Sequence, residues 1–348
     1  METMLAVIKE TASSVAEWKA IGVPEPGPQQ VLVRIRSAAL CGTDLHIYEW
    51  NQWAQSAGIK IPFIMGHEFC GDVVAVGDGV RGLAEGDKVA GETHYPCGCC
   101  KQCLNGEQHI CNHLRLFGVH MNGCFAAYTC LPAICARTLP SAIPYDLGAI
   151  MEPLGTAFRA AQEVNAGGAY VAVVGCGPIG IFAIACAVAM GAAKVIALDV
   201  ADNRLDLARR MGAGLTLNPA RQPVIEAILD ATGAYGVDAI IEASGNSQAV
   251  CQAFRFLRKG GRVALIGLPG DPVSLDLGKD IVFKEAKVVG IHGRKMFATW
   301  TAMENMLATG KLAVQPAVTH VLPLARWREG IELARTGQAC KVVYHPQE

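Results

Sequence analysis

The chain has 348 residues, of which 51 % are hydrophobic and 18 % are charged, with 38 glycines. This composition fits a globular α/β protein of about two domains, and it excludes a disordered, collagen-like or coiled-coil chain. Lys and Arg (30) nearly balance Asp and Glu (31) for a formal net charge of −1, so we expect neither a nucleic-acid partner nor an anionic membrane surface.

The N-terminal segment predicts no export signal. Met1–Glu10 carries an early acidic residue and only a short apolar run, which is too short for a signal-peptide core. Ile181–Leu198 is apolar except for Lys194, but Gly191 divides it into a small-residue helix and a strand, so we expect no membrane span. Fourteen cysteines without an export signal favour reduced thiols in the cytoplasm, serving as metal ligands or core residues.

The first part of the chain, up to about Leu154, is predicted to be a β-rich domain with long functional loops. Runs such as Val31–Arg36 and Gly71–Val76 have the composition of strands. Turns such as Pro24–Pro28 separate them.

One loop of this domain carries four closely spaced thiols, Cys97, Cys100, Cys103 and Cys111. Their spacing lets a single loop wrap a tetrahedral Zn²⁺ with four thiolates and no open position, which predicts a structural zinc site. An iron–sulfur cluster is disfavoured, because the bacterial ferredoxin pattern closes with a three-residue spacing and Cys-Pro. Cys99 does not fit the spacing of these four thiols and is predicted not to bind the metal.

A more widely spaced set predicts a second, catalytic zinc. Cys41, His67, Glu68 and Glu152 supply one thiolate, one imidazole and carboxylates. This mixed set is typical of zinc that keeps a position open for substrate. Each residue is a weak signal alone, and the spacing by itself leaves unrelated surface residues as an equal alternative.

From about Gly155 to Arg294 the pattern changes to alternating strands and helices, which predicts a parallel sheet with helices on both faces. The predicted elements are Tyr170–Val174, Ile179–Met190, Lys194–Asp199, Arg204–Met211, Val237–Glu242, Val250–Leu257, Arg262–Ile266 and Lys287–Ile291.

The C-terminal tail is too small to form a domain, so we expect it to return to the first one. It contains predicted helices at Phe297–Thr309 and Ala325–Thr336 and a strand at Lys341–Tyr344. The predicted domains are therefore 1–154 together with 296–348, and 155–295.

A G-x-G-x-x-G turn follows the first predicted strand of the α/β region, at Gly175, Gly177 and Gly180. Such glycines permit a tight turn and the close approach of a pyrophosphate to a helix N-terminus. Asp199, at the end of the next strand, would bind the adenosine ribose and favours NAD over NADP, because a carboxylate repels a 2′-phosphate. This context separates the motif from a simple glycine-rich turn.

Taken together, these motifs resemble the zinc-dependent medium-chain dehydrogenase family, and within it the L-threonine 3-dehydrogenases. The resemblance covers nearly the whole chain. Its specific stretches are Cys41–Trp50, Gly66–Glu68, Gly91–His94, the four-cysteine loop, Gly175–Gly180 and Gly293–Trp300. It implies an α/β protein with a GroES-like β-barrel catalytic domain and a Rossmann doubly wound coenzyme domain. It also implies NAD, two Zn²⁺ ions per chain and a cytoplasmic homotetramer.

The resemblance assigns roles to individual residues. Cys41, His67 and Glu68 match the catalytic zinc ligands, and Glu152 matches a carboxylate that binds or exchanges onto the metal. The four-cysteine loop matches the structural zinc site.

A proton relay and a set of cofactor contacts are implied as well. Thr43 and His46 resemble the relay that exports the alcohol proton, and His94 resembles a substrate-pocket residue. Their alternatives are an ordinary surface histidine for His46 and, for His94, a loop histidine touching the structural zinc loop. The implied cofactor residues, besides the glycines and Asp199, are Ile179, Arg204, Ile266, Ile291 and Arg294.

The expected reaction is the zinc-assisted oxidation, with NAD⁺, of L-threonine or a close β-hydroxy α-amino acid at C3. A zwitterion needs an acceptor near its ammonium and a donor near its carboxylate, which Glu152 and His94 could supply. Thr156 stands where the family pattern has Asn, and Lys295 and Ala298 also depart from it. A polyol or vicinal-diol dehydrogenase therefore stays open, as does, from a different class, a non-catalytic zinc- and NAD-binding relative.

Overall fold

The computed structural model describes residues 2–347 and divides into two compact units. The first unit runs up to Glu152 and resumes at Val318, and the second runs from Pro153 to Ala317. None of the helices in residues 2–347 has both the length and the apolar character that a bilayer crossing requires.

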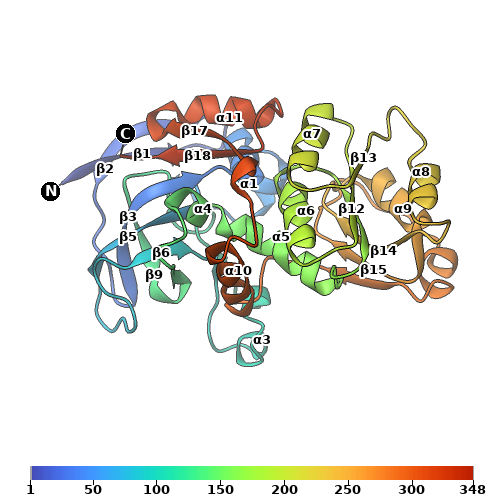
Figure 1. Cartoon of the computed structure of the whole chain (residues 1–348). Helices are drawn as coiled ribbons and strands as arrows, with labels where there is room; N and C mark the ends of the chain where they lie inside the picture. Colours follow the sequence, from blue (N-terminus) through green and yellow to red (C-terminus); the bar gives the residue numbers. More distant parts are fainter. Residues whose placement is uncertain (1, 348) are drawn as a thin grey trace. The chain divides into compact units, whose positions relative to one another are not determined.

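The first unit is built mostly from antiparallel strands (Figure 1). One sheet has the order β2-β1-β4, and a larger one runs β10-β6-β5-β3-β18-β17, with β9 also paired to β3. The strands are β1 (Thr3–Lys9), β2 (Glu17–Gly22), β3 (Gln30–Ala39), β4 (Phe63–Ile64), β5 (Glu68–Val76), β6 (Lys88–Gly91), β7 (His94–Tyr95), β8 (Arg115–Leu116), β9 (Tyr128–Pro132), β10 (Ala136–Thr138), β17 (Val318–Pro323) and β18 (Lys341–His345). The helices are α1 (Gly42–Glu49), α2 (Gln52–Ser56), α3 (Lys101–Leu104), α4 (Tyr145–Ala149) and α11 (Trp327–Arg335), while α5 (Met151–Glu163) begins at the division between the units.

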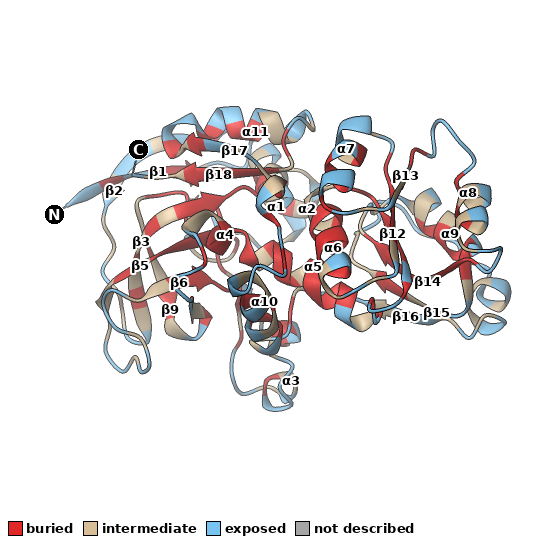
Figure 2. Ribbon diagram, in the orientation of Figure 1, coloured by how far each residue is buried: buried red, intermediate tan, exposed pale blue. Residues whose placement is uncertain are grey.

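Strand β3 shows why this sequence forms a sheet with one buried face. Val31, Val33 and Ile35 alternate with less buried residues, and side chains on a strand alternate between its two faces. The three buried side chains belong to the core of the unit, whose buried positions are red in Figure 2. Strand β18 pairs with β3 through Tyr344 and Ala38, so the C-terminal segment completes the same sheet.

The second unit is a parallel sheet of six strands in the order β13-β12-β11-β14-β15-β16. This order, with the strand of the glycine turn next to the centre, is that of a doubly wound dinucleotide-binding sheet. The strands are β11 (Tyr170–Val174), β12 (Lys194–Leu198), β13 (Leu215–Leu217), β14 (Val237–Glu242), β15 (Leu257–Leu265) and β16 (Lys287–Gly290). The helices are α6 (Pro178–Ala189), α7 (Asp202–Arg210), α8 (Val224–Ala231), α9 (Ser247–Arg255) and α10 (Ala298–Ala308).

Helices cover the two faces of this sheet, as the alternating pattern predicted. Figure 1 shows α6 on one side and α8 and α9 on the other. Residues 171–174 of β11 are all buried, which is typical of a parallel strand with covered faces. The elements β13, α8 and β17 were not predicted, since each is short.

The predicted position of the C-terminal domain boundary was wrong. Residues 296–317 were assigned to the first domain, but their contacts place them in the second unit. The physical reason is local packing, since Trp300 of α10 is fully buried and lies against Arg294 and Phe297. The 3₁₀ turn Gln315–Ala317 packs against α6 and α7, so the chain returns to the first unit only at Val318.

Candidate metal centres and cofactor site

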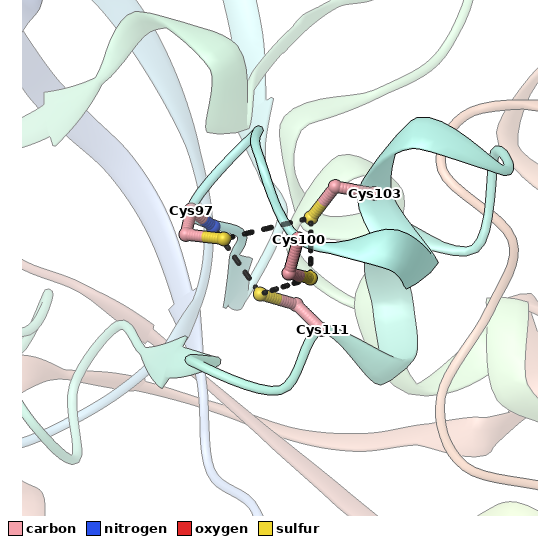
Figure 3. Close-up of side chains that lie close together, drawn as sticks. All are labelled: Cys97, Cys100, Cys103 and Cys111. Atoms are coloured by element: carbon pink, nitrogen blue, oxygen red, sulfur yellow. Dashed lines mark hydrogen bonds between the residues drawn. The ribbon is translucent and has the colours of Figure 1, made fainter.

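Four sulfur atoms of the cysteine loop point toward one another (Figure 3). The Sγ–Sγ distances are 3.5 Å for Cys100 and Cys103, 3.7 Å for Cys100 and Cys111, and 4.0 Å for Cys97 and Cys103. Zinc–sulfur bonds of about 2.3 Å in a tetrahedron separate the sulfurs by about 3.8 Å. The four thiols therefore fit one zinc ion with no position left for substrate.

Backbone hydrogen bonds favour the thiolate, the form that binds zinc, at Cys97 and Cys100, whereas burial raises the pKa of Cys103 to about 12. Hydrogen bonds from the N–H groups of Cys99 and Cys100 lower the pKa of Cys97 to about 6. The N–H groups of Cys97 and His113 both donate to the Cys111 Sγ at 3.3 Å. Cys99, predicted not to bind the metal, is exposed and lies outside the four-sulfur group, although its Sγ is 3.7 Å from that of Cys97.

A second group of ligand atoms comes from Cys41, His67 and Glu68, which lie within 4.8 Å of one another. Cys41 precedes the first turn of α1, and the other two residues stand at the start of β5. His67 and Glu68 are buried, and the Oε1 atom of Glu68 makes no hydrogen bond within residues 2–347. Buried polar atoms of this kind fit a metal ion, and a single thiolate with an imidazole and a carboxylate is the donor set of an open zinc site.

Two charged residues that the sequence did not single out hold this group. Asp44 Oδ1 lies 3.5 Å from His67 Nδ1, so the other ring nitrogen of His67 is the one available to a metal. Asp44 is itself fixed, because its Oδ2 accepts the Cys41 backbone N–H at 2.9 Å. Lys341, buried in β18, forms an ion pair with Glu68 and donates to the Leu40 carbonyl at 2.6 Å.

These charges act on one another in the buried interior. Burial alone would lower the pKa of His67, but the charges of Asp44 and Cys41 raise it well above its ordinary value. Burial raises the pKa of Glu68, opposed by Lys341 and reinforced by Glu152. The same pairing with Glu68 raises the pKa of Lys341 against the effect of its burial.

The association of Glu152 with the metal held by Cys41, His67 and Glu68 stays a prediction. The Glu152 carboxylate belongs to a separate group with Glu92 and His94, whose ligand atoms lie within 4.8 Å of one another. Glu152 lies in the first turn of α5, while Glu92 and His94 frame the start of β7. Because Glu152 still raises the pKa of Glu68, the two groups are neighbours.

The two predicted relay residues lie three positions apart on α1, and such positions share a helix face. His46 is exposed and Thr43 is partly buried. The Asn51 side chain fixes the His46 ring, since its Oδ1 accepts the Ala54 N–H at 3.2 Å and its Nδ2 contacts His46 Nδ1 at 2.7 Å. With the amide oxygen engaged in capping α2, Nδ1 of a neutral His46 accepts and Nε2 carries the proton.

The second unit contains a cavity of about 1050 Å³ at the carboxyl edge of its sheet. Gly175, Gly177, Asp199 and Arg204 line it. Gly177 immediately precedes α6, and a Cβ at this position would meet nothing within 4 Å, so ligand atoms can approach the backbone there. Gly175 has a φ of +87°, and a Cβ on Gly180 would lie 1.8 Å from the Gly175 carbonyl oxygen, so the turn requires both glycines. These features fit a dinucleotide.

Asp199 is buried and lines this cavity. Its carboxylate accepts the backbone N–H groups of Cys176 at 2.7 Å and Ala201 at 2.8 Å. Arg204 Nη1 lies 3.8 Å from the same carboxylate. The acid is thus fixed in position at the end of β12, as a ribose-binding residue must be.

Five other predicted cofactor residues do not line this cavity: Ile179, Gly180, Ile266, Ile291 and Arg294. Ile266 and Ile291 directly follow β15 and β16, so they lie on the same carboxyl edge as the glycine turn. Arg294 is 1 % exposed, lies within 3.5 Å of the Thr156 hydroxyl and stacks near Trp300. Their contacts with a cofactor stay predictions.

Sequence reasoning missed four residues of these sites: Asp44, Asn51, Glu92 and Lys341. Asp44 does have a sequence signal, because it is an acidic residue in the first turn of α1, three positions after the ligand Cys41. Lys341 carries no local signal, because it reaches Glu68 only through the pairing of distant strands.

Two family models match the chain. An alcohol dehydrogenase GroES-like domain covers residues 27–141, and a zinc-binding dehydrogenase domain covers residues 178–309. L-threonine 3-dehydrogenases from Bacillus licheniformis and Pyrococcus abyssi are 42 % and 41 % identical, each over 99 % of both chains.

Solved structures agree on the fold. A zinc-binding dehydrogenase from Sinorhizobium meliloti, solved with NADP, has a TM-score of 0.91 at 31 % identity over 99 % of this chain and 100 % of that one. The 2R,3R-butanediol dehydrogenase of Bacillus subtilis has a TM-score of 0.89 at 26 % identity over 99 % of both chains. The predicted GroES-like and Rossmann architecture is confirmed, and the chain belongs to the zinc-binding alcohol dehydrogenase family.

Proposed function

We propose that this chain oxidises the C3 hydroxyl of L-threonine, or of a close β-hydroxy α-amino acid, to the 2-amino-3-oxo acid with NAD⁺. The observation that carries the proposal is the group of Glu92, His94 and Glu152 beside the catalytic ligand set. In a β-hydroxy α-amino acid the ammonium group is on C2, next to the reacting C3. Carboxylates bind an ammonium group through charge-assisted hydrogen bonds. Identity of about 40 % over the whole chain to threonine dehydrogenases supports the same substrate.

The first unit would provide the residues that hold the catalytic zinc and move the substrate proton. Zinc, when bound, lowers the pKa of an alcohol hydroxyl and so favours loss of its proton. Cys41, His67 and Glu68 would hold that ion, with Asp44 orienting the imidazole of His67. The Thr43 hydroxyl would take up the substrate proton while giving up its own, and the exposed His46 would pass a proton on to solvent.

The second unit would bind and orient NAD⁺. The turn at Gly175 and the N-terminus of α6 suit the pyrophosphate, and the fixed Asp199 carboxylate suits the ribose hydroxyls. The carbon-bound hydrogen of the substrate would then leave as hydride to the nicotinamide ring. The NADP found with the Sinorhizobium meliloti structure is a property of that protein, while Asp199 argues for NAD here.

Replacing Asp199 by serine and Val200 by arginine is expected to shift the preference from NAD⁺ toward NADP⁺. Val200 is 67 % exposed and lines the same cavity, so an arginine there can reach a 2′-phosphate. Removing a repulsion and adding a charge-assisted contact should change the ratio of the two kcat/KM values by about a hundredfold. The exposed Asp206→Ser, outside the cavity, is the matched control and should leave the ratio unchanged. A wild-type protein that already prefers NADP⁺ would refute the role of Asp199.

The substrate is tested by comparing kcat/KM for L-threonine, D-threonine, L-serine, 2,3-butanediol and a sugar alcohol with NAD⁺. L-Threonine should have a higher value than 2,3-butanediol and the sugar alcohol, because only an amino acid carries an ammonium group for the group of Glu92, His94 and Glu152. A higher value for a neutral diol or polyol would overturn the proposal and leave the reaction class intact.

The fold likeness to 2R,3R-butanediol dehydrogenase favours a vicinal diol as the second candidate substrate. The lower sequence identity, 26 % against 42 %, ranks this candidate second.

We further propose that the protein acts in the cytoplasm as a homotetramer. Within residues 2–347, the structure places none of the fourteen cysteines in a disulfide bond, which suits a reducing compartment. The tetramer rests on the family resemblance alone, and size-exclusion chromatography with light scattering tests it.

A further inference from the structure

We propose that Cys99 is a peroxide-sensitive thiol that, once oxidised, forms a disulfide with the zinc ligand Cys97 and so releases the ion from the four-cysteine loop. The inference concerns this loop alone and does not depend on which alcohol the protein oxidises. It starts from a feature that the zinc site leaves unexplained, since the loop carries five thiols and a closed tetrahedral site uses four.

The fifth thiol lies beside the ligand set without belonging to it. Cys99 is not one of the four residues whose ligand atoms converge, yet its S–H group donates to the Cys97 Sγ at 3.7 Å. A thiolate bound to zinc keeps lone pairs that can accept such a contact. Cys99 therefore stays a thiol next to a ligand sulfur, and the ion does not occupy its own sulfur.

The same two thiols are the accessible ones of the loop. Cys97 and Cys99 are exposed, whereas Cys103 and Cys111 are buried and Cys100 is partly buried. Oxidants attack accessible thiols first, and a second thiol close by converts the first oxidation product into a disulfide. Exposure and proximity thus select the same pair.

The backbone between the two cysteines leaves room for this change. Gly98 separates them with a φ of +75°, and a Cβ at Gly98 would meet nothing within 4 Å. The turn can therefore adjust as the two sulfurs approach from 3.7 Å to the disulfide distance of about 2.05 Å. A bridge between residues two positions apart closes a small, strained ring, so thiol reductants should open it readily.

The oxidation consists of two balanced steps. A hydroperoxide transfers one oxygen to the Cys99 sulfur, so the O–O bond breaks, an S–O bond forms, and the thiol proton leaves with the other oxygen as an alcohol or water. The sulfur gives up an electron pair, and the peroxide is reduced. The Cys97 thiolate then attacks the Cys99 sulfur. The S–S bond forms, and the S–O bond breaks to release hydroxide, which takes a proton from solvent.

The disulfide removes one ligand from the metal site. A disulfide sulfur carries no negative charge, so the thiolates that remain are those of Cys100, Cys103 and Cys111. Zinc affinity falls with the loss of a thiolate, and the loop loses part of the stability that metal binding supplies. Oxidation at Cys99 would thus destabilise the loop reversibly.

The test exposes the zinc-loaded wild-type protein to hydrogen peroxide and follows zinc release with a chromogenic chelator. Wild type should release zinc at least about tenfold faster than Cys99→Ser, because the variant lacks the first thiol to be oxidised. Cys130→Ser is the matched control, since it removes a partly buried thiol of β9 that belongs to no ligand group, and its rate should equal that of wild type. A dithiol reductant with added zinc should then restore the zinc content of wild type.

Two further measurements identify the site. Peptide mass spectrometry of the oxidised wild type should show a disulfide between Cys97 and Cys99. The Cys41→Ser background lacks a ligand of the other metal site, so zinc released from it comes from the four-cysteine loop. This release should also slow about tenfold when Cys99→Ser is added. If Cys41→Ser fails to fold, the peptide map of the wild type decides.

Three results would overturn the inference. Equal rates of zinc release from wild type and Cys99→Ser would show that Cys99 is not the first thiol oxidised. A peptide map that joins Cys99 to another cysteine, or to none, would exclude the pairing. Loss of one zinc ion from Cys99→Ser under reducing conditions would make Cys99 a ligand. Failure to oxidise L-threonine would instead refute the proposed function and leave this inference standing.

Discussion

Replacing Cys41 by serine, or His67 by alanine, is expected to lower kcat with L-threonine by at least about a thousandfold in a protein that still folds. The two side chains belong to the mixed ligand group, and the acidification of an alcohol by zinc contributes several kcal/mol to the barrier. The group lies in the buried start of β5 and the beginning of α1, both of which are anchored by strand pairing and by Asp44. The fold should therefore persist without the ion.

Zinc content and thermal unfolding are measured on the same samples. Zinc should fall from two ions per chain to one, and the melting temperature should change little. Cys130→Ser is the matched control, since Cys130 is partly buried in β9 and belongs to neither ligand group. Retention of most of the activity in Cys41→Ser would exclude this thiol as a ligand of the reacting metal.

Replacing Cys100 by serine is expected to have the opposite pattern, a large loss of stability with a small loss of catalysis. The loop from Cys97 to Cys111 has little apolar core of its own, and its thiols converge on one point. Without the fourth thiolate the loop binds zinc more weakly, so metal binding contributes less to the stability of the folded protein. We therefore expect the melting temperature to fall by about 10 °C. The remaining folded enzyme should keep kcat within about tenfold, because a closed four-thiolate site has no position for substrate.

Differential scanning calorimetry and zinc analysis check this prediction. Cys99→Ser is the internal control, since Cys99 is exposed and outside the four-sulfur group, and it should keep two zinc ions. A Cys100→Ser protein with unchanged melting temperature and a thousandfold loss of kcat would reverse the assignment of the two sites.

The parts of the fold that the sequence predicted are those with local signals. The strand Tyr170–Val174 has the predicted bounds, because an apolar run ending in a glycine turn defines it. The four thiols converge as predicted, because the ligands of one loop need no tertiary information to meet.

The parts that could not be predicted depend on contacts between distant segments. Lys341 meets Glu68 because β18 pairs with β3, which in turn pairs with β5. The helix α10 lies in the second unit because Trp300 packs on Arg294, and the amphipathic pattern of α10 does not say which surface it will cover. Glu152 matches a family carboxylate, but only its place in α5 reveals its association with Glu92 and His94.

The most direct test of the whole account is the stoichiometry of the reaction in the zinc-loaded wild-type protein with L-threonine and NAD⁺. The account predicts one NADH and one 2-amino-3-oxobutanoate formed per L-threonine consumed, with both products formed at least about a thousandfold more slowly in Cys41→Ser at the same protein concentration. Absence of NADH formation with L-threonine, under conditions in which the same sample oxidises a neutral diol, would contradict it.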